Sequence, residues 1–293
     1  MKNILIAALA ASHSYVAQTL LWKRKEAQTL LDTQLLPKSE YDKRSGLGHD
    51  AQGLDDSSPL TDGVIRADDP RLQFTYGEFP LASLDVLLDR AMKIRNNEVA
   101  SVVRSSSNPT ERITVVDVGS GCGRLCLYMA LTRLTWAVHG IEISDLLHEE
   151  ATQAAKRAEQ YGFLRQRTDD DLLSSLAAAA AVDDDDPQPR FGGHLSLHLG
   201  PAEKFGRLLS QADILFCYST AWEASGFSEQ AGTLILSPQW NQVLTANTIQ
   251  RSPLVITTDR ALDPAYGWKI LEEIDVANPE VFGSRCYIQQ RLF

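Results

Sequence analysis

Short apolar runs alternate with segments of helical periodicity from about residue 72 to the end of the chain. Five apolar runs predict strands, at 113–118, 136–143, 195–199, 212–218 and 254–258, and the first of them is rich in β-branched residues. The segments between them carry apolar residues at helical spacing, and Ser144 and Ser237 stand where helices would begin. Runs 268–276 and 285–292 alternate in polarity and predict a closing hairpin. The pattern predicts an α/β domain built on a seven-stranded sheet.

An amphipathic helix is predicted before the first of these strands. Pro80 suits the first helical position, and apolar residues follow at steps of three and four: Leu81, Leu84, Leu87, Leu88, Ala91 and Met92. The polar stretch 104–110 would end this helix. Upstream, residues 34–70 are rich in Asp, Ser, Gly and Pro without a sustained period, which predicts a linker or surface arm.

The first residues resemble a secretory signal peptide, because Lys2 precedes the apolar stretch 4–11 and small residues follow it. The stretch is too short to span a membrane, and a buried N-terminal helix or strand is the alternative. Residues 11–17 also resemble the junction of bipartite plastid-targeting leaders. We expect a signal peptide at 1–14, a leader and linker at 15–70 and the catalytic domain at 71–293. The expected compartment is the secretory pathway or a plastid, otherwise the cytoplasm.

The chain is acidic, with a net charge of −10. Residues 1–50 hold seven Lys or Arg against five Asp or Glu, so the remainder carries −12. Such a body repels phosphates, which disfavours nucleic acid and leaves a protein or small molecule as the expected acceptor. The strongest basic cluster, residues 23–25, falls in the expected leader. An acidic insertion at 168–190 predicts a solvated loop, because its adjacent carboxylates do not converge on one ion.

The four cysteines lie at 122, 126, 217 and 286, without a CxxC motif or zinc spacing. Three of them fall in apolar runs, so we expect reduced thiols that pack as small hydrophobic groups. Cys122 and Cys126 could share a helix face and bind a metal, but no His or further Cys lies near them in the sequence. We therefore expect no metal.

The strand at 113–118 runs into a glycine-rich turn with Gly119, Gly121 and Gly123. Glycines let a ligand approach the backbone, and the following helix start offers free N–H groups. A dinucleotide fingerprint would need glycine at position 124, where the chain has Arg124. Asp117, just before the turn, can face the cationic amino-acid end of S-adenosylmethionine. The motif favours that cofactor; a purely structural turn is the alternative.

Glu142 ends the second predicted strand, where a carboxylate can accept both ribose hydroxyls of a nucleoside. This position supports the same cofactor. A surface glutamate at a strand end is the alternative.

On these residues the chain resembles the disruptor-of-telomeric-silencing type of histone lysine methyltransferases, which are class I enzymes without a SET domain. The resemblance lies in residues 74–78 with the helix after them, 117–123 and 140–142. It implies a Rossmann-like class I methyltransferase sheet, an N-terminal helical extension, a closing hairpin and S-adenosylmethionine as cofactor. It also implies a lid over the cofactor made by Tyr76, Gly77 and Glu78, in which Glu78 pairs with the donor's ammonium or anchors the loop.

Two segments depart from the family's pattern. After the fourth strand the family has Asn-Asn-Phe-Ala-Phe, whereas residues 218–222 read Tyr-Ser-Thr-Ala-Trp and lack both amides. After the third strand, residues 200–202 replace the family's adenine-binding Asp, so Glu203 is the nearest acid to the adenine. The family's basic nucleosome-binding segments also have no counterpart. The sequence thus supports the cofactor fold and not the lysine substrate.

Methyl transfer from a sulfonium is an in-line displacement, so the protein mainly aligns the reactants and excludes water. Tyr218, Ser219 and Trp222 occupy the usual acceptor side, and we expect them to align the acceptor; strand-end packing is the alternative. Three functions remain open. They are methyl transfer to a protein lysine or small molecule, cofactor binding without transfer, and nicotinamide-dependent oxidoreduction, which Arg124 disfavours.

Overall fold

The computed structural model describes residues 23–41, 44, 77–102, 113–133, 135–164, 193–247, 252–279 and 281–292. The expected signal peptide at 1–14, Tyr76 of the expected lid, the polar stretch 104–110 and the acidic insertion at 168–190 lie outside the described residues. In the part of the chain that is described, no helix is both long and apolar enough to cross a membrane.

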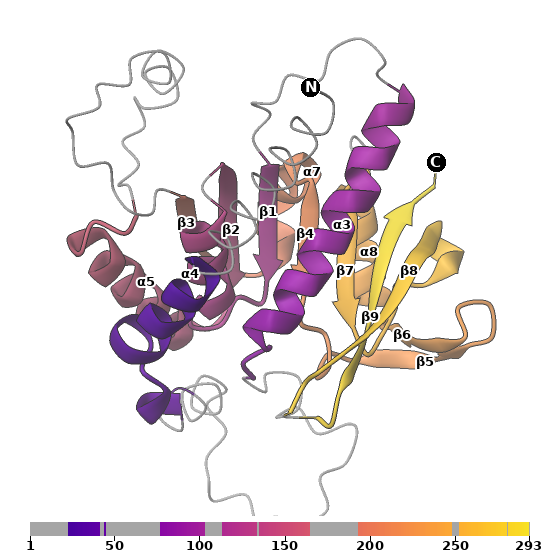
Figure 1. Cartoon of the computed structure of the whole chain (residues 1–293). Coiled ribbons are helices and arrows are strands. Elements are labelled where there is room, and N and C mark those ends of the chain that lie inside the picture. Colours follow the sequence, from indigo (N-terminus) through magenta and orange to yellow (C-terminus); the bar gives the residue numbers. More distant parts are fainter. Residues whose placement is uncertain are drawn as a thin grey trace, which may run out of the picture.

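A seven-stranded sheet forms the centre of the molecule, with strand order β3-β2-β1-β4-β7-β9-β8 (Figure 1). The strands are β1 (Ile113–Val118), β2 (Trp136–Glu142), β3 (His194–Leu199), β4 (Ile214–Cys217), β7 (Leu254–Thr258), β8 (Trp268–Val276) and β9 (Ser284–Arg291). The first five are parallel, and β9 runs antiparallel to both β7 and β8. This arrangement is the class I, Rossmann-like methyltransferase sheet with a closing hairpin that the sequence predicts.

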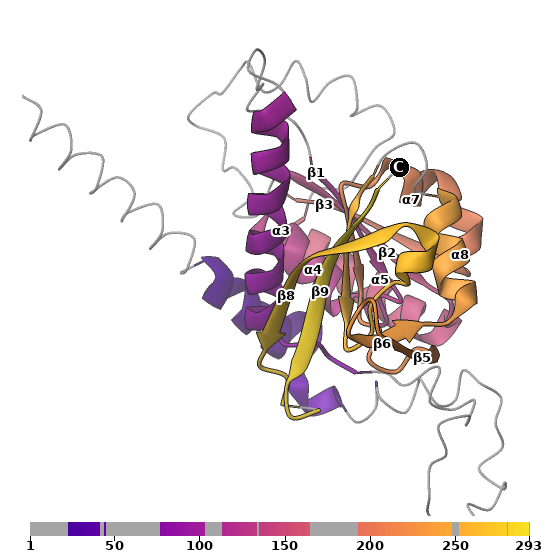
Figure 2. The ribbon, with the colours of Figure 1, turned by 90° about the vertical axis from the view of Figure 1, so that its right-hand side faces the viewer.

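Helices cover both faces of the sheet. The first face carries α3 (Leu81–Val102), α4 (Arg124–Thr132) and α5 (Asp145–Gln160), and the second carries α7 (Gly206–Gln211) and α8 (Pro238–Asn247). Figure 2 shows α3 and α8 on opposite sides of the strands. Ser144 caps α5 as predicted, since its side chain accepts a hydrogen bond from the Leu147 N–H. The central strands are therefore buried on both faces, which explains their nearly continuous apolar runs.

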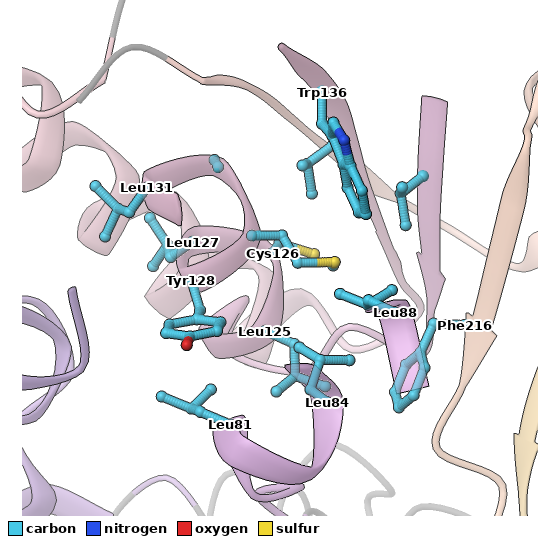
Figure 3. Close-up of a cluster of buried hydrophobic side chains, with 14 of the residues drawn as sticks. Leu81, Leu84, Leu88, Leu125, Cys126, Leu127, Tyr128, Leu131, Trp136 and Phe216 are labelled. Atoms are coloured by element: carbon cyan, nitrogen blue, oxygen red, sulfur yellow. The ribbon is translucent and has the colours of Figure 1, made fainter. Parts of the chain in front are cut away.

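The core on the first face lies between α3, α4 and the sheet. Figure 3 shows Leu81, Leu84 and Leu88 of α3 and Tyr128 of α4 in this cluster, together with Phe216 of β4. All five side chains are buried. The helical spacing of apolar residues that predicts α3 is thus the spacing of its contacts with the core.

The N-terminal segment is part of the folded unit, which differs from the linker expected at 15–70. Residues 23–30 are helical and continue into a π-helical turn, η1 (Leu31–Leu35), followed by η2 (Lys38–Glu40). Five of its apolar residues are buried: Ala27, Leu30, Leu31, Leu35 and Leu36. The reason is that most of these residues recur at steps of three and four and pack towards α4 and α5.

The basic cluster at 23–25 also lies within the fold rather than outside it. Arg24 of this cluster contacts two carboxylates of α3, at 3.3 Å from Asp85 and 3.0 Å from Asp89. The cluster therefore attaches the N-terminal helix to α3.

A separate hairpin lies between β4 and α8 and was not predicted. It consists of β5 (Ala224–Ser228) and β6 (Thr233–Leu236), paired antiparallel. The sequence of β5 contains Gly226 and two serines, so it lacks the alternation that identifies a half-buried strand. Phe227 and Leu234 pair across the hairpin and are both exposed.

The four cysteines are buried and form no disulfide, in agreement with the expected structural role. No group of three or more His, Cys, Asp or Glu residues that could hold a metal occurs within the described ranges.

Candidate functional site

A cavity of about 360 Å³ lies at the carboxyl ends of the parallel strands. Its walls come from the loops after β1, β2, β3 and β4, the segment before α3 and the start of α8. Small-molecule sites in α/β sheets occupy this edge and have volumes in this range. The cavity is lined by these sequence-predicted residues: Gly77, Glu78, Asp117, Gly119, Gly121, Glu142, Glu203, Tyr218 and Trp222.

The glycine-rich turn has a backbone that requires glycine. Gly119, Gly121 and Gly123 have φ values of 76°, 55° and 74°, which L side chains rarely adopt. A Cβ at Gly119 would also lie 3.5 Å from the Trp222 ring, and one at Gly123 would lie 3.0 Å from the Ala151 Cβ. The turn therefore brings bare backbone to the cavity wall and leads directly into α4.

Glu142 holds this turn in place from the end of β2. One of its carboxylate oxygens accepts from the Gly121 N–H at 2.7 Å, and the other accepts from the Ser144 N–H at 2.8 Å. Burial raises the pKa of Glu142, and these backbone N–H groups oppose the rise by stabilising the charge. Each carboxylate oxygen keeps a further acceptor position, so a hydroxyl can still bind there.

Asp117 lies near the carboxyl end of β1, next to the end of β2 that carries Glu142, and it accepts fewer hydrogen bonds than Glu142 does. Its side chain is buried, and the described residues offer it one hydrogen-bond donor, the Cys126 thiol at 3.4 Å. Burial raises the pKa of Asp117 to about 7, and the nearby Glu142 carboxylate adds to the rise while the thiol opposes it. A buried carboxylate with so little compensation is stabilised by a cation in the cavity.

Glu78 is engaged by two arginines at the cavity wall. It accepts from Arg44 Nη2 at 2.6 Å and lies 3.2 Å from Arg124 Nε. Arg44 is fully buried and also donates to the Pro37 carbonyl. Of the two roles expected for Glu78, the contacts correspond to anchoring the loop rather than to pairing with a ligand ammonium.

The side of the cavity where the sequence places the acceptor is aromatic. Trp222 stacks on Trp240 of α8, with ring centroids 3.8 Å apart, and Tyr218 packs on Phe79 at 5.2 Å. All four rings line the cavity. Sequence reasoning identified Tyr218 and Trp222 from their place after a strand, but not Phe79 and Trp240, which reach the cavity from helix starts elsewhere in the chain.

Ser219 does not line the cavity, which differs from its expected contact with the acceptor. Its side chain is fully buried, and the hydroxyl donates to the Thr258 carbonyl at 2.8 Å and accepts from the Thr258 N–H at 3.0 Å. Both hydrogen bonds connect the end of β4 to the end of β7. The geometry corresponds to the alternative of strand-end packing.

Two further residues, absent from the sequence predictions, hold the loop after β4. Asp259 accepts from the Thr220 hydroxyl at 2.6 Å, and Arg260 donates to the Ser219 carbonyl at 2.9 Å. Their position directly after a predicted strand was the only sequence signal available. They position the segment that carries Tyr218 and Trp222.

Glu203 lies on the opposite side of the cavity, in the short helix η4 (Ala202–Phe205) after β3. It is exposed at the cavity rim. Its backbone neighbours Gly200 and Pro201 complete this wall.

No protein-family model matches the chain, and no curated protein matches it by sequence. Among solved structures, it is similar to magnesium protoporphyrin IX methyltransferase from Synechocystis PCC 6803 with bound S-adenosylmethionine. The identity is 14%, the alignment covers 76% of this chain and 89% of that one, and the TM-score is 0.37.

It is also similar to an RNA methyltransferase from Salinibacter ruber in complex with S-adenosylhomocysteine, with 20% identity, coverage of 61% and 80%, and a TM-score of 0.35. Fibrillarin from Aeropyrum pernix gives 11% identity, coverage of 67% and 74%, and a TM-score of 0.36. Because these TM-scores are low, the fold assignment rests on the strand order and the site on its own contacts.

Proposed function

We propose that this chain is an S-adenosylmethionine-dependent methyltransferase. The observation that supports it most is the meeting of the glycine turn, Asp117 and Glu142 in one cavity at the carboxyl edge of a class I sheet. These groups come from two neighbouring strands. Ligands of open α/β sheets bind at this edge.

The donor set fits this cofactor. Among the described residues, the buried Asp117 carboxylate has a thiol as its one donor, which suits a cationic amino-acid end. Glu142 retains acceptor positions for ribose hydroxyls. The glycine turn allows close approach of the ligand to the backbone. Glu203 stands on the side where the adenine would lie. When bound, the cofactor supplies a methyl group on a sulfonium.

The chain's own residues would align the acceptor and exclude water. Trp222 lies against the glycine turn, and its stacking on Trp240 restricts its movement. Tyr218 is held by Phe79 and by a hydrogen bond from the Asn278 amide at 3.1 Å. An aromatic wall of this kind keeps water from a displacement that needs no strong base.

For the acceptor, we propose a group that presents an apolar or aromatic surface to these rings. The resemblance noted in the sequence makes a protein lysine one candidate acceptor, and a small molecule is the other. Both kinds of acceptor fit an apolar wall. Cofactor binding without transfer is the competing function, because the amides expected after β4 are absent.

Calorimetry with S-adenosylmethionine and S-adenosylhomocysteine tests the cofactor site. We expect wild-type protein to bind both, and Asp117→Ala and Glu142→Ala each to weaken binding by about 1.5 to 3 kcal/mol, since each removes a charge-assisted contact. Glu149→Ala, on the exposed face of α5, is the matched control and should leave the affinity unchanged. Unchanged affinity in both site variants would contradict the assignment.

Transfer is tested by incubating the protein with labelled S-adenosylmethionine and a cell extract. Label in a protein band would identify a protein acceptor, and label in the low-molecular-mass fraction would identify a small molecule. Cofactor binding with no label transferred would support the binding module instead. Binding of a nicotinamide cofactor, without S-adenosylmethionine binding, would support an oxidoreductase.

A further inference from the structure

Arg124 lines the cavity, begins α4 and directly follows the glycine turn. Its side chain is only 7% exposed. The proposed contacts with the donor do not use it. A buried arginine at a ligand cavity is costly unless its donors are matched, so its partners indicate what it binds.

Two of its three nitrogens are held by carboxylates. Nη2 donates to Asp32 in η1, and Nε lies 3.2 Å from Glu78. The third nitrogen, Nη1, is buried and has no hydrogen-bond partner among the described residues. A buried charged donor without an acceptor is destabilising, and an acceptor supplied by a ligand would remove that cost.

Arg124 belongs to a network of ion pairs that contains two other cations. Arg44 shares Glu78 with Arg124, and Lys38 lies 3.1 Å from Asp32. Lys38, Arg44 and Arg124 therefore meet in this cluster. The N–H groups at the start of α4 add partial positive charge beside it. This partial charge favours an anion at this end of the cavity.

Asp117 presents the opposite charge at the other end of the glycine turn. The amino-acid moiety of S-adenosylmethionine carries an ammonium and a carboxylate on one carbon atom, so it needs a cationic and an anionic partner close together. We propose that Arg124 binds the carboxylate of this moiety, with Asp117 facing its ammonium. This inference rests on the proposed function. Asp32 and Glu78 are then positioning residues that orient the guanidinium.

The test compares S-adenosylmethionine with its decarboxylated analogue, which keeps the ammonium and the sulfonium but lacks the carboxylate. We expect Arg124→Met to weaken S-adenosylmethionine binding about ten- to hundred-fold, as loss of one charge-assisted hydrogen bond would. Binding of the decarboxylated analogue should change by less than about threefold, because it has no carboxylate to lose.

Arg133→Met is the matched control. Arg133 follows the same helix and is also ion-paired, at 3.0 Å from Asp85 and 2.9 Å from Asp89, but it does not line the cavity. It should leave the preference between the two ligands unchanged. If Arg124→Met does not fold, Arg124→Lys gives the same comparison with a smaller loss, since it keeps the charge and loses the planar fork.

The outcomes separate the two proposals. Equal weakening of both ligands by the Arg124 variants would show that Arg124 acts only structurally and would overturn the carboxylate site alone. Failure of the wild-type protein to bind either ligand would overturn the proposed function itself.

Discussion

At the scale of single residues, the charge state of Asp117 links the cavity to pH. Its carboxyl group is buried beside Glu142 and the Cys126 thiol, with Cys217 also nearby, and its pKa is raised from 3.8 to about 7. Near neutral pH the group is therefore close to half protonated. A cationic ligand favours the ionised form, so binding and proton release are coupled.

We expect the affinity for S-adenosylmethionine to fall as the pH is lowered through 7, approaching about tenfold per pH unit well below that value. Calorimetry over about two pH units on either side would measure the slope. Asp117→Asn cannot ionise, so its affinity should be lower and nearly independent of pH over this range. An equal slope in this variant would assign the pH dependence to another group, with Glu142 the first candidate because its pKa is also raised.

The same shift affects folding stability in a defined direction. Between 3.8 and about 7 the folded protein holds a proton on Asp117 that the unfolded chain has released. The free energy of unfolding therefore decreases as the pH rises through this window, because the folded state binds more protons. A cation bound in the cavity would offset this loss, so the free energy of unfolding at neutral pH should be higher with the ligand than without it.

At the scale of elements, the N-terminal helix and η1 connect the cavity to the body of the protein. Asp85 of α3 accepts from the Tyr128 hydroxyl at 2.5 Å and from Arg133 at 3.0 Å, and it lies 3.3 Å from Arg24. The Asp85 carboxylate is buried, so it depends on these partners. One carboxylate thus connects three helices, while Asp32 of η1 reaches the cavity through Arg124.

Because the N-terminal helix and η1 belong to the folded unit, their buried apolar side chains should contribute to the free energy of unfolding. We expect Leu31→Ala to lower the free energy of unfolding by about 2 to 5 kcal/mol, because Leu31 is fully buried against the core. Gln34→Ala, in the same turn but exposed, should have little effect. Urea denaturation measures both. A Leu31→Ala protein with wild-type stability would mean that the domain begins further along the chain.

At the scale of the whole molecule, charge limits the acceptors that can approach. The chain carries −10 overall. Among the described residues, the cavity walls include one basic residue, Arg124, and five acidic residues: Glu78, Asp117, Glu142, Glu203 and Glu223. Glu78 is paired with Arg44 and Arg124, but the net charge of the chain gives a negative field at long range. Polyanionic partners meet repulsion at this surface.

We therefore expect nucleosomes to be poor methyl acceptors. Label transfer from S-adenosylmethionine to nucleosomes should stay low and should not increase as the ionic strength is lowered, since the net charge of −10 repels polyanions more strongly at low salt. The acceptor found in the extract serves as the positive control. Efficient transfer to nucleosomes that weakens with added salt would show this expectation to be wrong.

The sequence by itself determined the sheet and the cofactor side of the cavity. Strand runs, the glycine turn and the acids Asp117 and Glu142 could be predicted because each depends on local geometry and on the rule that parallel strands end at one edge. β1, β7 and β8 begin and end at the predicted residues. In these places, what a residue does follows from its immediate neighbours in the chain.

Only the tertiary structure decided the rest of the site. Trp240 and Arg44 meet the cavity wall from positions far from the motifs, and Ser219 turns away from it to join β7. In the sequence, Arg124 stands where a dinucleotide fingerprint would need glycine. Only the folded structure shows that it contacts Asp32, which lies 92 residues away in the chain. The physical reason is that burial and ion pairing depend on which segments pack together, and periodicity along one segment does not specify its partner.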